Sequence, residues 1–288
     1  MFSGWSRNFL VFLTCAALLS RNVVWSAETS HEIEQFSVSL GADTIAGEVH
    51  RIKGSEPATA LIIAGGSGVC SRSDTSSAVP LFLRGKTAIV LVDRRGCGTS
   101  TGTFTRPGTR NSRWLVPRLA MDLEAVADYL RTDGFSRVGV LGSSFGGWLA
   151  VSAAGGDRLD FFVTMNGGAQ SVAMSDTFDR LTDDGMTIDQ AITETRATAL
   201  IRSYDPTLDL ERISVPGVFI LATNDASNPM VLDKESIEYW RLRGKPFEAI
   251  IVNDADHELV NTTTGEVDLN WVPRVNAFIE GSLDITIN

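Results

Sequence analysis

Cysteine and histidine are scarce in this sequence, and their scarcity excludes several kinds of site. The 288 residues include three cysteines and three histidines. The cysteines lack the spacing of zinc-ligand pairs, and His31, His50 and His257 lie far apart in the chain. Zinc or iron sites built from several such ligands are therefore excluded, and we expect neither a metal nor a cofactor.

Positive charge is also in short supply. The chain has 25 Lys and Arg against 35 Asp and Glu, which gives a net charge of −10 at pH 7. Proteins that bind nucleic acid neutralise its phosphates with clustered basic side chains. The composition therefore argues against nucleic acid as a partner.

One stretch, residues 84–118, is nevertheless basic, with eight basic side chains and a single acid, Asp93. Two interpretations stay open. Arginines such as Arg106 or Arg110 bind an anionic group of a substrate, or the stretch pairs with acids further along the chain. Those acids are Asp176, Asp179, Asp183 and Asp184.

Long hydrophobic runs are absent except near the N-terminus. Residues 9–19 are apolar apart from Thr14 and follow Arg7. This run is much shorter than the roughly 20 residues that a membrane-spanning helix needs. A basic start, a short apolar run and small residues after it are typical of a secretory signal peptide. We predict a signal peptide over residues 1–27 and an exported protein, periplasmic or secreted, without stable membrane insertion after cleavage; an uncleaved N-terminal anchor is the alternative.

Removal of residues 1–27 would leave two cysteines, Cys70 and Cys97. Disulfides form and persist in the oxidising compartments to which exported proteins go. The two residues could pair there, but their positions in the sequence do not show that they lie close enough.

The remaining apolar residues form a regular series. Residues 35–52 alternate between apolar and polar around a turn at 41–43, which predicts an antiparallel hairpin. The later apolar runs are short and continuous, as in strands buried on both faces, and helical periods lie between several of them. This alternation predicts one α/β domain over residues 28–288, with a mostly parallel sheet covered by helices on both faces. The continuous runs are 60–64, 88–92, 138–141, 161–165, 218–222 and 249–252.

Residues 170–212 interrupt this series because they contain no strand-like run. Thr187 and Gln190 form a capping box at the start of a helical pattern. We predict a helical lid insertion over residues 170–212. The alternative is an ordinary long crossover whose helices pack on the sheet.

The run 138–141 leads directly into Gly142-Ser143-Ser144-Phe145-Gly146, followed by an apolar helical pattern. A strand, G-x-S-x-G and a helix together form a nucleophile elbow. The sharp turn exposes the hydroxyl of Ser144, and the two glycines avoid clashes that side chains would cause. The helix directs its first amides, including that of Phe145, toward the place where an oxyanion would form.

A serine nucleophile needs a base, and the base needs an acid that orients it. Asp225 follows the apolar run 218–222, and His257 follows the run 249–252. Both therefore come at strand ends and in the order that follows an elbow serine. Asp254 and Asp256 stay open as alternatives for the acid.

A second oxyanion donor is expected from another strand end. Gly65-Gly66-Ser67-Gly68 follows the run 60–64 and is made of small residues. We predict that the amide of Ser67 is this donor, with that of Gly66 as the second choice.

These motifs resemble the α/β-hydrolase superfamily over nearly all of residues 28–288. Asp93–Ser100 is similar to the D-x-R-G-x-G-x-S loop of that superfamily. The passage from Gly146 to Gly168 looks like exported bacterial esterases related to dienelactone hydrolases and to prolyl-oligopeptidase catalytic domains. The resemblance implies an α/β-hydrolase fold with an eight-stranded sheet, and a carboxylic-ester hydrolase that forms an acyl-enzyme on Ser144. A peptidase or amidase with the same residues is one alternative, and a non-catalytic binding protein of the same fold is another.

Overall fold

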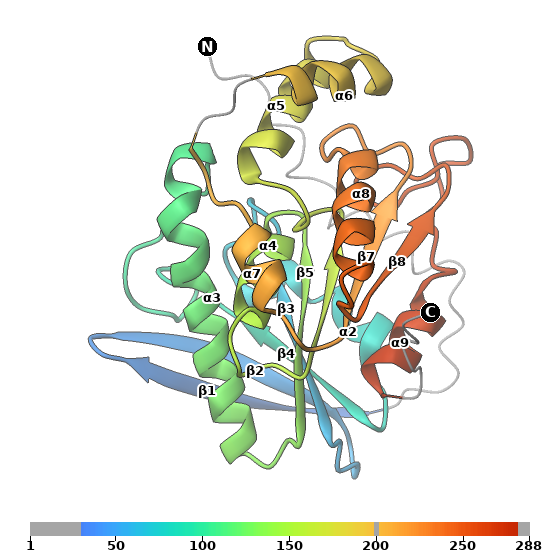
Figure 1. Cartoon of the computed structure of the whole chain (residues 1–288). Coiled ribbons are helices and arrows are strands. Elements are labelled where there is room, and N and C mark those ends of the chain that lie inside the picture. The colour runs from blue at the N-terminus through green and yellow to red at the C-terminus, as the bar shows by residue number, and fades with distance from the viewer. Residues whose placement is uncertain (1–29, 199–201, 282–288) are drawn as a thin grey trace.

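A single sheet of eight strands forms the centre of the molecule. The computed structural model describes residues 30–198 and 202–281. The strand order is β1-β2-β4-β3-β5-β6-β7-β8 (Figure 1). The strands are β1 (His31–Leu40), β2 (Asp43–Ile52), β3 (Thr59–Ala64), β4 (Thr87–Val92), β5 (Arg137–Ser143), β6 (Phe161–Met165), β7 (Gly217–Ala222) and β8 (Phe247–Val252).

The direction of the strands agrees with the sequence pattern. The alternating segment 35–52 forms the antiparallel pair β1 and β2, and β2 also pairs antiparallel with β4. The continuous apolar runs form strands β3 to β8, and the pairings of these strands with one another are all parallel. The predicted mostly parallel, eight-stranded sheet is confirmed. Because β3 to β8 are parallel to one another, their carboxyl ends lie at the same edge of the sheet, which we call the carboxyl edge.

Helices cover both faces of the sheet and bury apolar side chains against it. Ile62 of β3 packs in a cluster with residues of α3, α4 and α8. Its neighbours Leu61 and Ile63 point to the other face and pack in a cluster with residues of α2 and α9. The helices are η1 (Arg72–Thr75), α2 (Ala78–Phe82), α3 (Thr109–Thr132), α4 (Phe145–Ala154), α5 (Val172–Asp183), α6 (Ile188–Ala197), α7 (Thr207–Arg212), α8 (Met230–Arg241) and α9 (Val272–Ile279).

The segment predicted as an insertion contains α5, α6 and α7, between β6 and β7. The predicted capping box is present, because Gln190 N donates to Thr187 Oγ1 and Thr187 N donates to Gln190 Oε1. Helices α5 and α6 lie above the carboxyl edge (Figure 1). Together with one residue of α8 they form a small apolar cluster, which consists of Phe178, Leu181, Ala191, Ile192 and Leu232. The action of this inserted segment as a lid stays a prediction.

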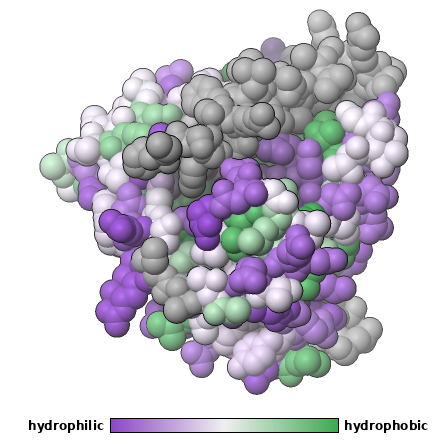
Figure 2. Space-filling view, turned by 90° about the horizontal axis from the view of Figure 1, so that it is seen from above, coloured by the Kyte–Doolittle hydropathy of each residue, from purple (hydrophilic) through white to green (hydrophobic). Residues whose placement is uncertain are grey.

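The predicted signal peptide, residues 1–27, lies outside the described residues. Among the helices of the described part of the chain, none is long and apolar enough to cross a membrane. Seen from above, the visible described surface is largely hydrophilic, with hydrophobic side chains in small separate patches (Figure 2).

Candidate active site

Ser144 lies at the tight turn between β5 and α4. Its backbone has φ 51° and ψ −121°, a conformation that residues other than glycine rarely adopt. A Cβ at Gly142 would overlap the carbonyl of Gly146, and a Cβ at Gly146 would overlap the carbonyl of Ala64. The chain therefore requires glycine at both positions, as the sequence motif indicated.

The loop after β3 comes close to this serine. A Cβ placed on Gly66 would lie 3.3 Å from Ser144 Cβ and 3.8 Å from its Oγ. Within residues 30–198 and 202–281, the N–H groups of Gly66, Ser67 and Phe145 donate no hydrogen bond. Three backbone donors from the two segments that meet at Ser144 are therefore available to a ligand.

Asp225 and His257, from the ends of β7 and β8, are in contact. His257 Nδ1 lies 2.8 Å from Asp225 Oδ2. The other carboxylate oxygen of Asp225 accepts from the N–H groups of Ser227 and Asn228, both at 2.8 Å. The Asp225 side chain is 1% exposed and that of His257 is 14% exposed. The carboxylate is thus fixed by its own loop and holds the imidazole with Nδ1–H as the donor, which leaves Nε2 as an acceptor.

The charges around His257 make it a stronger base. Burial of the ring lowers its pKa, but the carboxylates of Asp225, Glu258 and Asp179 raise it by more. The net effect is a pKa of His257 above its ordinary value. Within the described residues, Ser144 Oγ makes no hydrogen bond with His257 or with any other group.

The two alternative acids do not contact the imidazole in a hydrogen bond. Asp256 Oδ1 accepts from the N–H groups of Glu258 and Val260, at 3.0 and 2.9 Å. Asp254 has a φ of 57° and its N–H donates to Thr223 Oγ1. Both residues shape the turn that carries His257.

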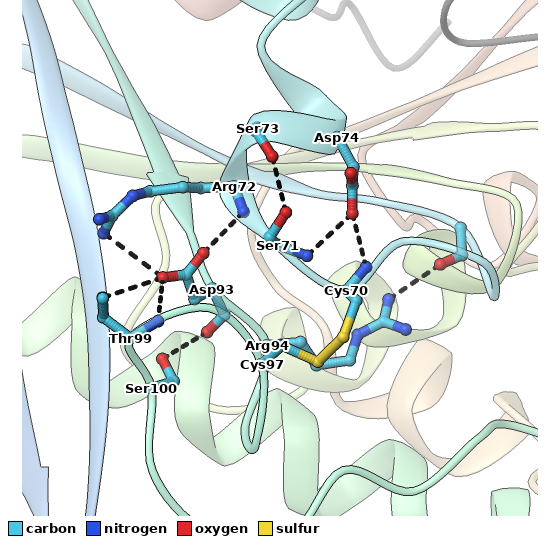
Figure 3. The surroundings of a disulfide bond; sticks show 11 residues. Cys70, Ser71, Arg72, Ser73, Asp74, Asp93, Arg94, Cys97, Thr99 and Ser100 are labelled. Atoms are coloured by element: carbon cyan, nitrogen blue, oxygen red, sulfur yellow. Dashed lines mark hydrogen bonds and ion pairs between the residues drawn. A yellow bond between two sulfur atoms is a disulfide. The ribbon is translucent and has the colours of Figure 1, made fainter.

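A disulfide joins the two loops that follow β3 and β4. Cys70 and Cys97 are bonded, with their Cα atoms 5.4 Å apart (Figure 3). Arg94 N also donates to Cys70 O, at 3.0 Å. The pairing that the sequence left open is present.

Two neighbouring arginines of the basic stretch have different surroundings. Arg95 is paired with Asp43 and Asp122, and Arg118 lies 3.7 Å from Asp43. Arg94 instead donates from Nη2 to the carbonyl oxygens of Gly65 and Gly66, each at 2.9 Å. None of these three arginines pairs with the acids at 176–184.

The sequence profile of the prolyl oligopeptidase family, a peptidase family, matches residues 74–286. This is well over half of the chain and includes Ser144, Asp225 and His257. The chain belongs to the prolyl oligopeptidase family. It is therefore a serine hydrolase of the α/β-hydrolase superfamily.

Solved structures similar to this prolyl oligopeptidase family member share its fold. An esterase from Pyrococcus furiosus has 15% identity and a TM-score of 0.66, over 88% of this chain and 92% of the esterase. The proline iminopeptidase of Mycobacterium smegmatis has 16% identity and a TM-score of 0.60, over 86% of this chain and 98% of that protein. An esterase from Pyrobaculum calidifontis has 17% identity and a TM-score of 0.57, over 87% of this chain and 86% of the esterase. A search of curated proteins found no match.

Asn166, which contacts the candidate site, was not identified from the sequence. Its Nδ2 donates to His257 O at 2.7 Å, and its Oδ1 accepts from Ala222 N at 2.9 Å. The preceding residue, Met165, accepts from Ser144 N at 2.8 Å. Asn166 and Met165 thus connect the segments that carry Ser144, Asp225 and His257. Its place directly after the apolar run 161–165, at a strand end, was the available signal.

Helix α5 contacts the loop that follows Asp225. Ser175 Oγ donates to Asn228 Oδ1 at 2.7 Å, and Thr182 Oγ1 donates to Ala226 O at 2.5 Å. The positions 175, 179 and 182 share one face of the helix. Asp179 lies between them, and burial raises its pKa to about 6.

Below this loop lies a fully buried acid, Asp233 of α8. Asn228 Nδ2 donates to Asp233 Oδ2. Burial raises the pKa of Asp233 to about 8, so its carboxyl is mostly neutral at pH 7. Asp225 is therefore surrounded by a polar network that also includes α5 and α8.

Proposed function

We propose that this protein hydrolyses carboxylic esters, with Ser144 as nucleophile, His257 as general base and acid, and Asp225 as the acid that orients the imidazole. The observation that carries the proposal is the 2.8 Å hydrogen bond between His257 and Asp225, at the same edge of the sheet as the Ser144 turn.

The first half of the reaction acylates the enzyme. Ser144 Oγ attacks the carbonyl carbon while His257 Nε2 takes its proton, and the carbonyl electrons move to the oxygen. The amides of Phe145 and Ser67, with Gly66 beside them, stabilise that oxyanion. When the carbon–oxygen bond of the ester breaks, His257 returns the proton to the leaving alcohol, and an acyl-Ser144 remains.

The second half regenerates the serine. His257 takes a proton from a water molecule, and the resulting hydroxide attacks the acyl carbon. The second oxyanion collapses, the bond to Ser144 Oγ breaks, and the proton passes from His257 to Oγ. The acid product then leaves, and no cofactor takes part.

Peptide or amide hydrolysis is the second candidate. It is supported by membership in the prolyl oligopeptidase family and by the likeness to a proline iminopeptidase. The same residues would serve, with an amine in place of the alcohol.

The decisive experiment is labelling of the purified protein with a fluorophosphonate, followed by intact mass and peptide mapping. We expect one adduct on Ser144 that is absent in Ser144→Ala and lost in His257→Ala. Turnover of matched acyl esters and aminoacyl amides then separates the two candidates. A folded protein without adduct would contradict both and would leave a non-catalytic binding protein.

We also propose that the protein is exported, periplasmic or secreted, with residues 1–27 as a cleaved signal peptide. The Cys70–Cys97 disulfide supports this, because such bonds are rare in reducing compartments. N-terminal sequencing of the protein recovered outside the cytoplasm tests it. A full-length N-terminus on membrane-bound protein would support the anchor instead.

A further inference from the structure

Arg94 is hydrogen-bonded to the loop that lies against the side chain of Ser144. Its Nη2 donates to two successive carbonyls, those of Gly65 and Gly66. Within the described residues no carboxylate lies within ion-pair distance of Arg94, whereas the adjacent Arg95 has two. The guanidinium of Arg94 is thus directed at backbone rather than at an acid.

Because the peptide group is planar, the direction of each of these carbonyls fixes the direction of the N–H group in the same peptide. The carbonyl of Gly65 shares its peptide plane with the N–H of Gly66, and the carbonyl of Gly66 shares its plane with the N–H of Ser67. In a trans peptide the C=O and N–H point in opposite directions. Because both carbonyls point toward Arg94, both N–H groups point away from it. These are two of the three donors without an acceptor near Ser144.

Arg94 also contacts the other side of the turn. The carbon of its guanidinium lies 5.6 Å from the centre of the Phe145 ring. Phe145 supplies the third free N–H. One cation therefore touches both segments from which oxyanion donors are expected.

The charge of Arg94 is retained although the group is desolvated. Burial lowers its pKa to about 10, against the opposing effect of the Asp74 carboxylate, so the guanidinium stays positive at pH 7. A cation hydrogen-bonded to a carbonyl polarises the peptide and makes its N–H a stronger donor, most of all where water is excluded.

The disulfide fixes the relative position of the two loops involved (Figure 3). The loop with the two carbonyls continues to Cys70, and the loop with Arg94 continues to Cys97. Arg94 N donates to Cys70 O, and Cys97 N donates to Arg94 O at 2.8 Å. Arg94 is therefore hydrogen-bonded through its backbone to both bridged cysteines.

We propose that Arg94 is a positioning residue for the oxyanion hole, which aligns and polarises the Gly66 and Ser67 N–H groups through the carbonyls of Gly65 and Gly66. This inference rests on the proposed function, since it assigns a role within the same hydrolytic site.

The test compares Arg94→Met with Arg94→Lys and with a matched control, Arg113→Met. Arg113 is an exposed arginine of the same basic stretch, on α3. We expect Arg94→Met to lower kcat about 10- to 100-fold with little change in KM, because an oxyanion donor acts mainly in the transition state. Arg94→Lys keeps the charge but lacks the planar guanidinium, so its kcat should lie between that of the wild type and that of Arg94→Met. Arg113→Met should behave as the wild type.

A trifluoromethyl ketone provides the readout that a purely structural role would not move. Ser144 adds to its carbonyl and forms a bound oxyanion, so its inhibition constant reports the donors directly. We expect that constant to rise in Arg94→Met by about the same factor as kcat falls, while the KM for the matched ester and the fluorescence-monitored Tm of Arg94→Lys change little.

The outcomes separate the two proposals. If the wild-type protein shows neither turnover nor an adduct on Ser144, the proposed function is contradicted. A wild type that turns over, with kcat and ketone inhibition unchanged in Arg94→Met, overturns the role of Arg94 alone. If Arg94→Met does not fold, unchanged ketone inhibition in Arg94→Lys overturns it equally.

Discussion

Ser144 is held by backbone geometry, whereas Asp225 and His257 are held by hydrogen bonds to each other, to the loop after Asp225 and to Asn166. The serine depends on a left-handed backbone angle and on glycines that admit neighbouring carbonyls. His257 is hydrogen-bonded to Asn166 through its carbonyl, and Asp225 is hydrogen-bonded to the N–H of Asn228, whose side chain contacts helix α5. Substitution of the glycines around Ser144 would therefore cause steric overlap with backbone atoms, whereas substitution of one hydrogen-bonding residue near Asp225 or His257 would remove a single contact. Substitutions on the two sides should therefore differ in kind as well as in size.

The largest effect is expected at Ser144, the proposed nucleophile. Ser144→Ala should lower kcat by about 10⁴- to 10⁶-fold, because the acyl-enzyme can no longer form. The substitution removes one oxygen, so the Tm should stay close to that of the wild type. Steady-state turnover of an activated ester, with thermal unfolding alongside, checks both. Residual turnover near the wild-type level would assign the nucleophile elsewhere.

Asn166→Ala should have an intermediate effect. It removes the hydrogen bond to His257 O and leaves the N–H of Ala222 without its acceptor. A small displacement of the imidazole is expected to cost about 10- to 100-fold in kcat/KM. The rate of fluorophosphonate labelling of Ser144 should fall in parallel. Asn276→Ala is the control, since this asparagine bonds Leu81 O on the other face of the sheet.

The charge around His257 gives a pH prediction. A general base acts when neutral, so kcat/KM should rise as the pH increases through the pKa of His257, and this rise should lie above pH 6.5. Asp179→Asn removes one carboxylate that raises this pKa, so the rise should move to lower pH. Asp184→Asn, an exposed position paired with Arg180, should leave the profile in place. Identical profiles for all three proteins would contradict the electrostatic role of Asp179.

The last effect concerns stability rather than rate. The pKa of Asp233 is about 8 in the folded protein and has a reference value of 3.8. Between these values the folded state binds more protons than the unfolded state, so the free energy of unfolding falls as the pH rises. Asp233→Asn removes this titration and should gain stability relative to the wild type from pH 5 to pH 8. Urea midpoints at both pH values measure it, and parallel changes in the two proteins would exclude it.

The contrast between the Ser144 turn and the surroundings of Asp225 and His257 also explains which features could be predicted from the sequence. The positions of the strands and their mostly parallel direction follow from the apolar runs, and Ser144 follows from a motif with local steric causes; the order of the strands in the sheet was not predicted. Asp225 and His257 are strand-end residues in a known order. Asn228, Asp233 and Ser175 gave no such signal, because their roles arise where an insertion, a loop and a helix meet in space. The pairing of Cys70 with Cys97 likewise depends on β3 and β4 being neighbours.

The separate apolar cluster of α5 and α6 gives the protein an adaptable part. Phe178 and Ile192 pack with Leu232 instead of with the two clusters on the sheet. Exchange of residues on α6 therefore leaves the foundation of the molecule untouched, while the polar face of α5 keeps the acid loop in register. The apolar side chains of α6 can therefore vary in sequence without any change to the two clusters that pack on the sheet.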